Sequence, residues 1–282
     1  MNRPLLICTD LDRTLLPNGA EPESPAARRW FRKLAELPEI TLAYVSGRHA
    51  ALVRDAIIDY DLPLPDFVIG DVGATLYSCQ RWRWEPWPAW TQHIAPDWGG
   101  RSRVQLAVLL QDIPELRLQE TVKQNTHKLS YYVSLHTNHQ YLLDQVRQRL
   151  IARSIRASLI WSIDGPANTG LLDILPARAS KRHAIEFLMA ERGFKQGNTV
   201  FSGDSGNDLP VLVSPIPATL VNNASPAIKA EAWQTVRMTG AERTLYLAQG
   251  GFFGMNGNYA AGILEGIAHY HPAITARLEK TA

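Results

Sequence analysis

The sequence is poor in cysteine and contains no long apolar run. Only two of its 282 residues are cysteines, Cys8 and Cys79, and Cys8 lies in an apolar run typical of a buried strand. So few thiols exclude a framework of structural disulfides and favour a reducing compartment, which predicts a cytoplasmic protein. The apolar run before Asp10 is too short for a signal-peptide core or a membrane-spanning helix, so we expect neither export nor membrane insertion.

An excess of charge of one sign is also lacking. The chain has 29 Lys and Arg against 27 Asp and Glu, which gives a formal net charge of +2. This balance favours neither nucleic acid nor an anionic membrane as a partner, although positive charges can still gather in a cleft. With 45% apolar and 20% charged residues, the composition is that of an ordinary globular protein.

Strands and helices alternate in the first part of the chain. Apolar or β-prone runs predict strands at residues 5–9, 40–45 and 66–69. A helix is expected over residues 26–37, with Ser24 as its N-cap and Pro25 at its first position, and another ends near Tyr60. This order predicts an α/β fold with a doubly wound, mostly parallel sheet.

The pattern changes over residues 84–166, which we interpret as an inserted, smaller α+β domain. It holds expected strands at residues 129–135 and 157–163, a helix at 141–152, and a final turn, Asp164-Gly165-Pro166. Residues 1–83 and 167–282 would form the core. There the α/β alternation returns with a strand at 171–175, a helix at 181–192 closed by Gly193, and a strand at 199–202.

Acidic residues follow the first and the last of these core strands. Asp10 and Asp12 stand directly after the first strand, where one carboxylate could attack phosphorus and the other could transfer protons, although an acidic turn is the simpler alternative. Two further acids, Asp204 and Asp208, lie with Asn207 in a glycine-rich loop after residues 199–202. Such a loop suits Mg²⁺, with a structural or calcium-binding loop as the alternative.

Groups suited to phosphate occur at the same edge of the expected sheet. Ser46, Gly47 and Arg48 end the second strand and offer a hydroxyl, a backbone N–H and a cation, or they form an ordinary turn. Lys181 begins a helix, where the helix dipole disfavours a cation, so phosphate binding would explain its position, with a surface lysine as the alternative. The four groups together favour phosphoryl transfer.

In order and spacing, these four groups resemble the motifs of the haloacid dehalogenase superfamily of phosphatases. The insertion lies between the second and third motifs, as in members with a larger α+β cap. Within the superfamily the chain resembles the sucrose-phosphate phosphatases in three further stretches. These are Gln124-Asn125 with Lys128-Leu129-Ser130-Tyr131, Asp173-Ile174-Leu175-Pro176, and Ala261-Gly262-Ile263-Leu264-Glu265.

The resemblance implies a Mg²⁺-dependent phosphatase of a small sugar phosphate, with sucrose 6-phosphate the first candidate. It implies that Asp10 becomes an aspartyl-phosphate and that Asp12 is the general acid and base. The implied metal residues are Asp10, Asp12 through its backbone carbonyl, Asp204 and Asp208, and the implied phosphate ligands are Ser46, Gly47, Arg48, Lys181 and Asn207. Arg13 departs from the usual Gly or Asn, which is expected to alter loop packing or substrate entry.

Substrate recognition is expected in the insertion. Gln124, Asn125, His127 and Lys128 form a polar cluster that could bind sugar hydroxyls, or simply a polar loop before a strand. The five tryptophans at positions 82, 84, 87, 90 and 98 could stack on a sugar, but packing within the protein is favoured.

The same residues also suit other substrates and a related enzyme. Mannosylfructose phosphate, glucosylglycerol phosphate and hexose phosphates are alternative substrates, and a phosphomutase of the same superfamily is an alternative enzyme. A binding protein on an inactive fold would be expected to lack Asp10, Asp12 or Asp204, and all three are present. A sugar-phosphate synthase of the same pathway is a candidate protein partner.

Overall fold

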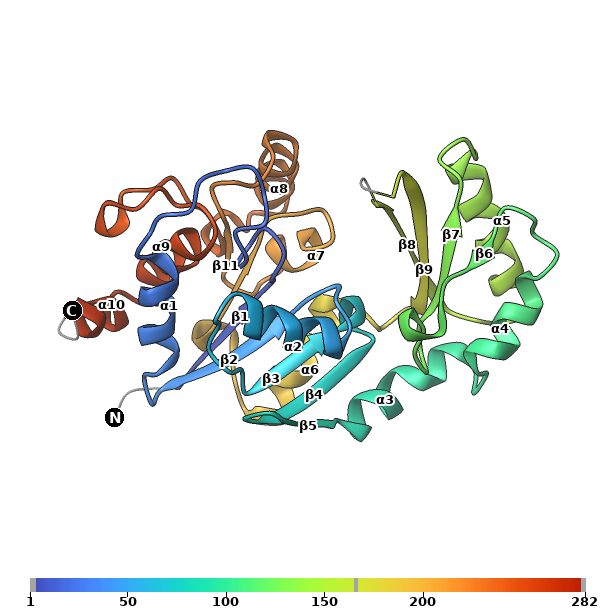
Figure 1. Ribbon diagram of the computed structural model, residues 1–282, viewed down its shortest axis with the longest axis horizontal. Coiled ribbons are helices and arrows are strands. Elements are labelled where there is room, and N and C mark those ends of the chain that lie inside the picture. Colours follow the sequence, from blue (N-terminus) through green and yellow to red (C-terminus); the bar gives the residue numbers. More distant parts are fainter. Residues whose placement is uncertain (1–3, 165–166, 280–282) are drawn as a thin grey trace.

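The computed structural model describes residues 4–164 and 167–279, whose larger part is built on one eight-stranded sheet (Figure 1). The strand order is β12-β11-β10-β1-β2-β3-β4-β5. The strands are β1 (Leu5–Thr9), β2 (Ile40–Val45), β3 (Phe67–Gly70), β4 (Thr75–Gln80), β5 (Arg83–Pro86), β10 (Thr199–Gly203), β11 (Ala218–Leu220) and β12 (Leu245–Leu247). All pairs from β12 to β3 are parallel, whereas β4 and β5 add an antiparallel hairpin.

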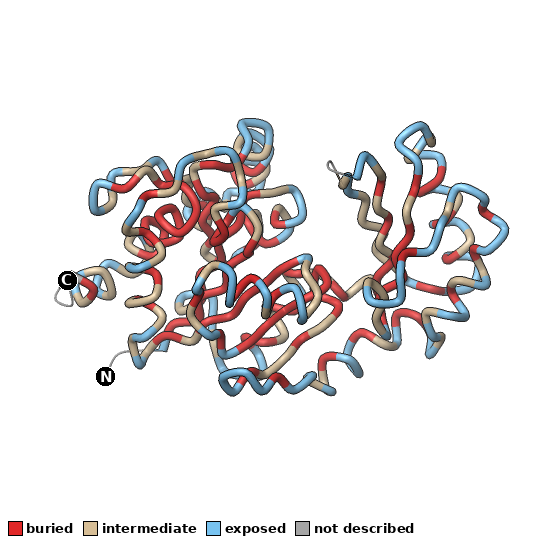
Figure 2. Tube along the Cα trace, in the orientation of Figure 1, coloured by how far each residue is buried: buried red, intermediate tan, exposed pale blue. Residues whose placement is uncertain are grey.

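Helices cover both faces of this sheet, because successive side chains of its central strands point to opposite sides. Leu5 and Ile7 pack with α1 (Ala27–Ala35), α2 (Ala50–Asp59), α9 (Ala260–Tyr270) and α10 (Pro272–Glu279). Leu6 and Cys8 pack on the other face with α3 (Pro88–Ile94), α6 (Lys181–Arg192), α7 (Leu209–Leu212) and α8 (Pro226–Thr239). Buried residues follow the strands and the inner sides of the helices (Figure 2). The expected doubly wound α/β fold is confirmed.

The smaller part, residues 95–164 and 167–176, is called the cap below. Its four-stranded antiparallel sheet has the order β6-β7-β9-β8. The strands are β6 (Arg117–Leu118), β7 (Leu129–Val133), β8 (Ala157–Asp164) and β9 (Thr169–Pro176). Helices α4 (Arg103–Leu110) and α5 (His139–Ile151) pack on one face of this sheet (Figure 1). Residues of the cap sheet, among them Ile160 and Asp173, border a cavity.

The boundaries of the cap differ from those expected from the sequence. The strand expected at residues 171–175 in the core is β9, which pairs along its length with β8 in the cap sheet. A short apolar run fits a central strand of either sheet equally well, so its pattern could not decide between them. At the N-terminal boundary of the cap, β5 and α3 pack with the core. The chain therefore passes from core to cap after α3 and not after residue 83. Gly165 and Pro166, where the second boundary was expected, lie outside the described residues.

The predicted N-cap residue of the first helix, Ser24, is wrong, whereas the predicted C-terminal residue of the later helix, Gly193, is right. Helix α1 begins at Ala27 without a side-chain cap, because the hydroxyl oxygen of Ser24 instead accepts the N–H of Asn256 at 3.0 Å. Helix α6 spans residues 181–192 as predicted and ends at Gly193, which adopts the left-handed conformation. In the part of the chain that the structure describes, no helix combines the length and hydropathy needed to cross a bilayer.

Candidate active site

The parallel strands bring the loops after β1, β2 and β10 to one edge of the core sheet. These loops border a cavity of about 960 Å³. From the core, Asp10, Arg48 and Asp204 line the cavity, and from the cap, Lys128 and Asp173 line it. The site therefore lies where the carboxyl ends of the strands meet the cap sheet.

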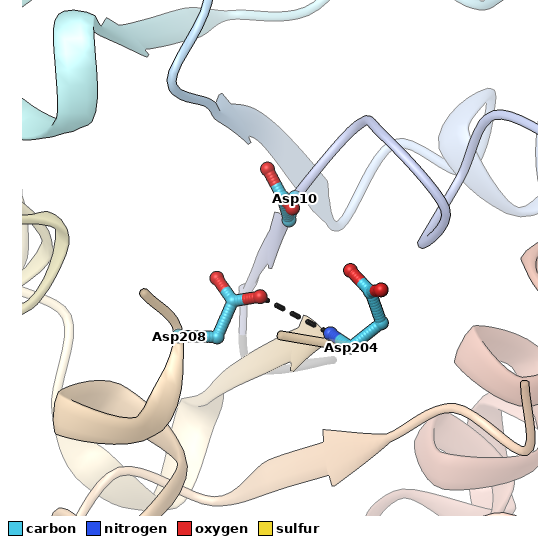
Figure 3. A group of neighbouring side chains, drawn as sticks. All are labelled: Asp10, Asp204 and Asp208. Carbon is cyan, nitrogen blue, oxygen red and sulfur yellow. Dashed lines mark hydrogen bonds between the residues drawn. The ribbon is translucent and has the colours of Figure 1, made fainter. Parts of the chain in front are cut away.

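Three buried carboxylates converge at this edge (Figure 3). One carboxylate oxygen each from Asp10, Asp204 and Asp208 lies within 4.8 Å of the other two. The ammonium of Lys181 lies 3.0 Å from Oδ1 of Asp10 and 2.7 Å from Oδ1 of Asp208. Three acids thus share a single buried cation, so negative charge is in excess.

This excess shifts the protonation of the acids. Burial, together with the charges of Asp208 and Asp204, raises the pKa of Asp10 to about 8, although Lys181 opposes the shift. Burial and the charge of Asp208 raise the pKa of Asp204 to about 6, against the hydrogen bond from Thr14. Crowded, desolvated carboxylates of this kind gain from a bound divalent cation, and their oxygens are the ligands that Mg²⁺ prefers. The donor set therefore fits Mg²⁺.

Asp208 differs from the other two acids because it accepts hydrogen bonds from the backbone of its own loop. Its Oδ2 accepts hydrogen bonds from the backbone N–H groups of Asp204 and Ser205, each at 3.1 Å, while its Oδ1 contacts Lys181 (Figure 3). Gly203 leaves room for this carboxyl, since a Cβ there would lie 2.6 Å from the Asp208 Cγ. Asp208 therefore organises the loop that presents Asp204.

The side chain of Asp12 points to Arg48 and not into the acidic group. Nε of Arg48 donates to Oδ2 of Asp12 at 2.8 Å and Nη2 donates to Oδ1 at 2.6 Å, while Asn18 donates to Oδ1 at 2.7 Å. Burial acts to raise the pKa of Asp12, but the hydrogen bonds and charge of Arg48 outweigh it and lower the pKa. Asp12 is thus held as a carboxylate within reach of the same cavity.

Most of the expected phosphate ligands are brought together. Gly47, Arg48, Lys181 and Asn207 line the cavity, and Nζ of Lys181 donates to Oδ1 of Asn207 at 3.0 Å. Ser46 is buried behind them, where its hydroxyl oxygen accepts the N–H of Arg48 at 3.1 Å. Lys181 is the first residue of α6 and is buried, so it is not the surface lysine that was the alternative.

Of the four cap residues expected to bind substrate, only Lys128 lines the cavity. The side-chain amide of Gln124 binds the backbone of Ser130 and Gln119. The side-chain oxygen of Asn125 accepts the N–H of His127, whose ring packs edge-on against Trp98. These three residues therefore shape the loop that presents Lys128.

Most of the tryptophan cluster packs within the protein, as predicted, whereas Trp82 is exposed. Trp90 and Trp98 are fully buried, and none of the five tryptophans lines the cavity. Trp161 of β8, outside that cluster, does line it. Sequence reasoning also missed Gln119 and Lys123 of the cavity wall, which precede the expected polar cluster and carry no distinguishing pattern.

Two further charged residues lie at the site, of which Arg13 was expected to alter loop packing or substrate entry and Asp71 was not predicted. Nε of Arg13 lies 3.3 Å from Oδ2 of Asp204, and Arg13 has a left-handed backbone with φ of 59°. Asp71 follows β3 and lies 3.4 Å from the Lys128 ammonium. A signal for Asp71 was present, because it occupies the same position after its parallel strand as Asp10 does after β1.

The fold and the site together define a phosphatase of the haloacid dehalogenase class. The chain belongs to the sucrose-6F-phosphate phosphohydrolase family, whose model matches residues 3–271. It is accordingly an enzyme, a phosphoric monoester hydrolase acting on sugar phosphates.

Relatives cover nearly the whole chain. A HAD-like hydrolase of Nitrosococcus oceani, whose name specifies no substrate, is 53% identical over 99% of this chain and 75% of its own. The mannosylfructose-phosphate phosphatase of Agrobacterium fabrum is 29% identical over 95% of this chain and 98% of its own. In fold, the chain is similar to the sucrose-phosphatase of Synechocystis sp. PCC6803 solved with sucrose and phosphate, with a TM-score of 0.72, 24% identity, and coverage of 95% and 98%.

Proposed function

We propose that this chain is a Mg²⁺-dependent phosphatase that hydrolyses sucrose 6-phosphate through an aspartyl-phosphate on Asp10. The observation that carries the proposal is the contact of Asp10 with Lys181 inside a buried acidic group, on a cavity that core and cap share. The match to the sucrose-6F-phosphate phosphohydrolase family supports the choice of sugar.

In the first step a carboxylate oxygen of Asp10 attacks phosphorus, and the bond from phosphorus to the sugar oxygen breaks. That sugar oxygen takes the electron pair and a proton from Asp12. Arg48 binds both oxygens of Asp12 in the present arrangement, so it must release Asp12 before this carboxyl can take up a proton and deliver it. A phosphate group entering the cavity offers Arg48 an alternative bidentate partner.

In the second step Asp12 takes a proton from water, whose oxygen attacks phosphorus. The bond from Asp10 to phosphorus breaks, which restores the Asp10 carboxylate and releases phosphate. Lys181 and Arg48, with Gly47, Ser46 and Asn207, would hold the phosphate oxygens and offset their charge. Each of these groups belongs to one of the loops gathered at the sheet edge.

Mg²⁺ would be held by Asp10 and Asp204, with Asp208 supporting the loop and the backbone carbonyl of Asp12 as a further ligand. When bound, Mg²⁺ supplies positive charge that offsets the phosphate oxygens and the crowded carboxylates. The raised pKa values of Asp10 and Asp204 support a cation at this place.

The cap would close over the phosphate site and recognise the sugar. Residues of its sheet and Lys128 border the cavity, whose volume is in the range of pockets for small ligands. Closure would exclude water before transfer of the phosphoryl group. Gln124, Asn125 and His127 would contribute by shaping the Lys128 loop.

Mannosylfructose phosphate is the second candidate substrate, because the Agrobacterium phosphatase of that name is similar along nearly its whole length. A synthase of the same pathway stays a predicted partner. A cytoplasmic location stays a prediction that rests on the two cysteines, both of which are free thiols.

A phosphate-release panel tests the proposal. Purified protein is offered sucrose 6-phosphate, mannosylfructose phosphate, glucosylglycerol phosphate and hexose phosphates, each with Mg²⁺ and with chelator. We expect the highest kcat/KM on sucrose 6-phosphate, with loss of turnover in chelator. A higher value on another sugar would reassign the substrate, formation of an isomeric sugar phosphate would indicate a phosphomutase, and turnover in chelator would reject Mg²⁺ dependence.

A further inference from the structure

The turn after β3 carries an unusual backbone. Asp71, Val72 and Gly73 all have positive φ, at 52°, 59° and 103°. This region disfavours residues with a side chain, and a β-branched valine most of all. A turn of this kind persists only where its surroundings hold it.

The turn is held by the loops that form the phosphate site. The backbone N–H of Asp71 donates to the carbonyl of Arg48 at 3.0 Å, and that of Val72 donates to the carbonyl of Ser46 at 3.1 Å. Gly73 lies against the start of α6, where a Cβ would come within 2.3 Å of the Ser180 backbone. The turn therefore contacts the loop after β2, which carries Arg48, and the start of α6, which carries Lys181.

The side chain of Asp71 reaches from this turn to the cap. Its Oδ2 accepts the hydroxyl of Thr75 at 3.2 Å, which leaves Oδ1 facing the ammonium of Lys128 at 3.4 Å. The same ammonium lies 3.6 Å from Oδ2 of Asp173 on the cap sheet, and Asp71 and Lys128 are buried. Two carboxylates, one from the core and one from the cap, thus hold a single cation at the cavity wall.

A second contact between core and cap lies beside the two chain segments that connect them. The fully buried carboxylate of Asp97 accepts the backbone N–H of Arg178 at 2.8 Å and binds its guanidinium at 3.0 Å. Within the cap it also pairs with Arg156. The contact between Asp71 and Lys128 is a separate link between core and cap, at the cavity wall.

We propose that Asp71 is a positioning residue, which acts through Lys128 to fix the cap against the phosphate-binding loops. The Lys128 ammonium has three N–H donors, of which one hydrogen-bonds Asp71, and Asp173 lies near it as an ion pair. Because Lys128 also lines the cavity, a remaining donor would be available to a substrate hydroxyl. The contact between Asp71 and Lys128 then links the phosphate-binding loop of Arg48 to a residue proposed to bind the sugar. This inference rests on the proposed function for its kinetic part.

Asp71→Asn tests the inference, because it keeps the shape of the side chain and removes its charge. We expect kcat/KM for sucrose 6-phosphate to fall about tenfold, chiefly through KM, while turnover of a small aryl phosphate stays within about twofold. The double variant Asp71→Asn with Lys128→Met should be no worse than Lys128→Met alone. Glu85→Gln, at an exposed core carboxylate, is the control for loss of charge.

Hydrogen exchange supplies a readout that needs no substrate. In Asp71→Asn the amides of residues 119–131 should exchange faster than in the wild type, with no such change in Glu85→Gln. Unchanged exchange and kinetics, equal losses on both substrates, or multiplied losses in the double variant would each overturn the role of Asp71. A wild type that hydrolyses no phosphate ester would instead reject the proposed function, and the exchange result would still decide the contact.

Discussion

The ammonium of Lys181 lies 3.0 Å from Oδ1 of Asp10, and both side chains are buried. Burial alone would lower the pKa of this lysine, but the charges of Asp10 and Asp208 outweigh burial and raise it above its ordinary value. Lys181 therefore stays cationic. It contacts one oxygen of the proposed nucleophile, and among the described residues no hydrogen bond engages the second oxygen, which would face phosphorus or a cation.

Lys181→Met should lower the free energy of unfolding by about 3–5 kcal/mol near neutral pH, because it leaves buried carboxylates without their cation. Urea unfolding measures this loss. Arg147→Met, which breaks an exposed ion pair with Asp144, should change stability by no more than about 1 kcal/mol. Equal effects of the two variants would show that Lys181 does not offset the buried charge.

The affinity of the metal-free protein for Mg²⁺ should rise with pH. Asp10 and Asp204, with pKa values of about 8 and about 6, must lose their protons to bind a cation. The dissociation constant should fall by up to about tenfold per pH unit for each proton released. Calorimetric titrations between about pH 6 and pH 8, in buffers that differ in ionisation enthalpy, measure the dissociation constant and the number of protons released. An affinity independent of pH would contradict the assignment of these ligands.

The same two carboxyls give the metal-free protein a stability that depends on pH. Because their pKa values are raised on folding, these two groups hold more protons in the folded protein than in the unfolded chain. Their contribution to stability should therefore decrease as pH rises from about 4 to about 8, and saturating Mg²⁺ should remove most of this decrease.

Arg13→Asn should bind Mg²⁺ several-fold more tightly than the wild type. The guanidinium of Arg13 lies 3.3 Å from Asp204, where it competes with a cation, and asparagine tolerates the left-handed backbone better than arginine. Calorimetry compares the two proteins, with Arg13→Lys as a variant that keeps the charge. Weaker binding by Arg13→Asn would mean that Arg13 supports Asp204 instead.

The core of the site was predictable because it depends on few elements. Once residues 5–9, 40–45 and 199–202 are identified as parallel strands, Asp10, Arg48 and Asp204 must meet at one sheet edge. No longer-range information is needed for these three residues.

The cap was harder to predict because its contacts are set by tertiary pairing. The strand at 171–175 could join either sheet, and only its pairing with β8 assigns it to the cap. Gln124 and His127 look like polar ligands in the sequence, yet backbone groups and Trp98 engage them in the structure. Arg13 contacts Asp204 and Lys128 contacts Asp71, which are distant from them in sequence, so neither contact follows from local pattern.

Asp12→Asn should separate the two proposed steps. Without a general base the phosphorylated enzyme cannot be hydrolysed, so a slowly formed aspartyl-phosphate should accumulate on Asp10. Mass spectrometry of the acid-quenched protein would detect one added phosphoryl group. Full multiple turnover by Asp12→Asn would exclude Asp12 as the general base.

Phosphate release by Asp10→Asn tests the central claim most directly. An amide is a poor nucleophile and a poor metal ligand, so the variant should remain folded by circular dichroism while kcat falls by at least about a thousandfold. Asp12→Asn, assayed beside it, should still incorporate a phosphoryl group, whereas Asp10→Asn should incorporate none. Turnover by Asp10→Asn near that of the wild type would contradict the aspartyl-phosphate mechanism.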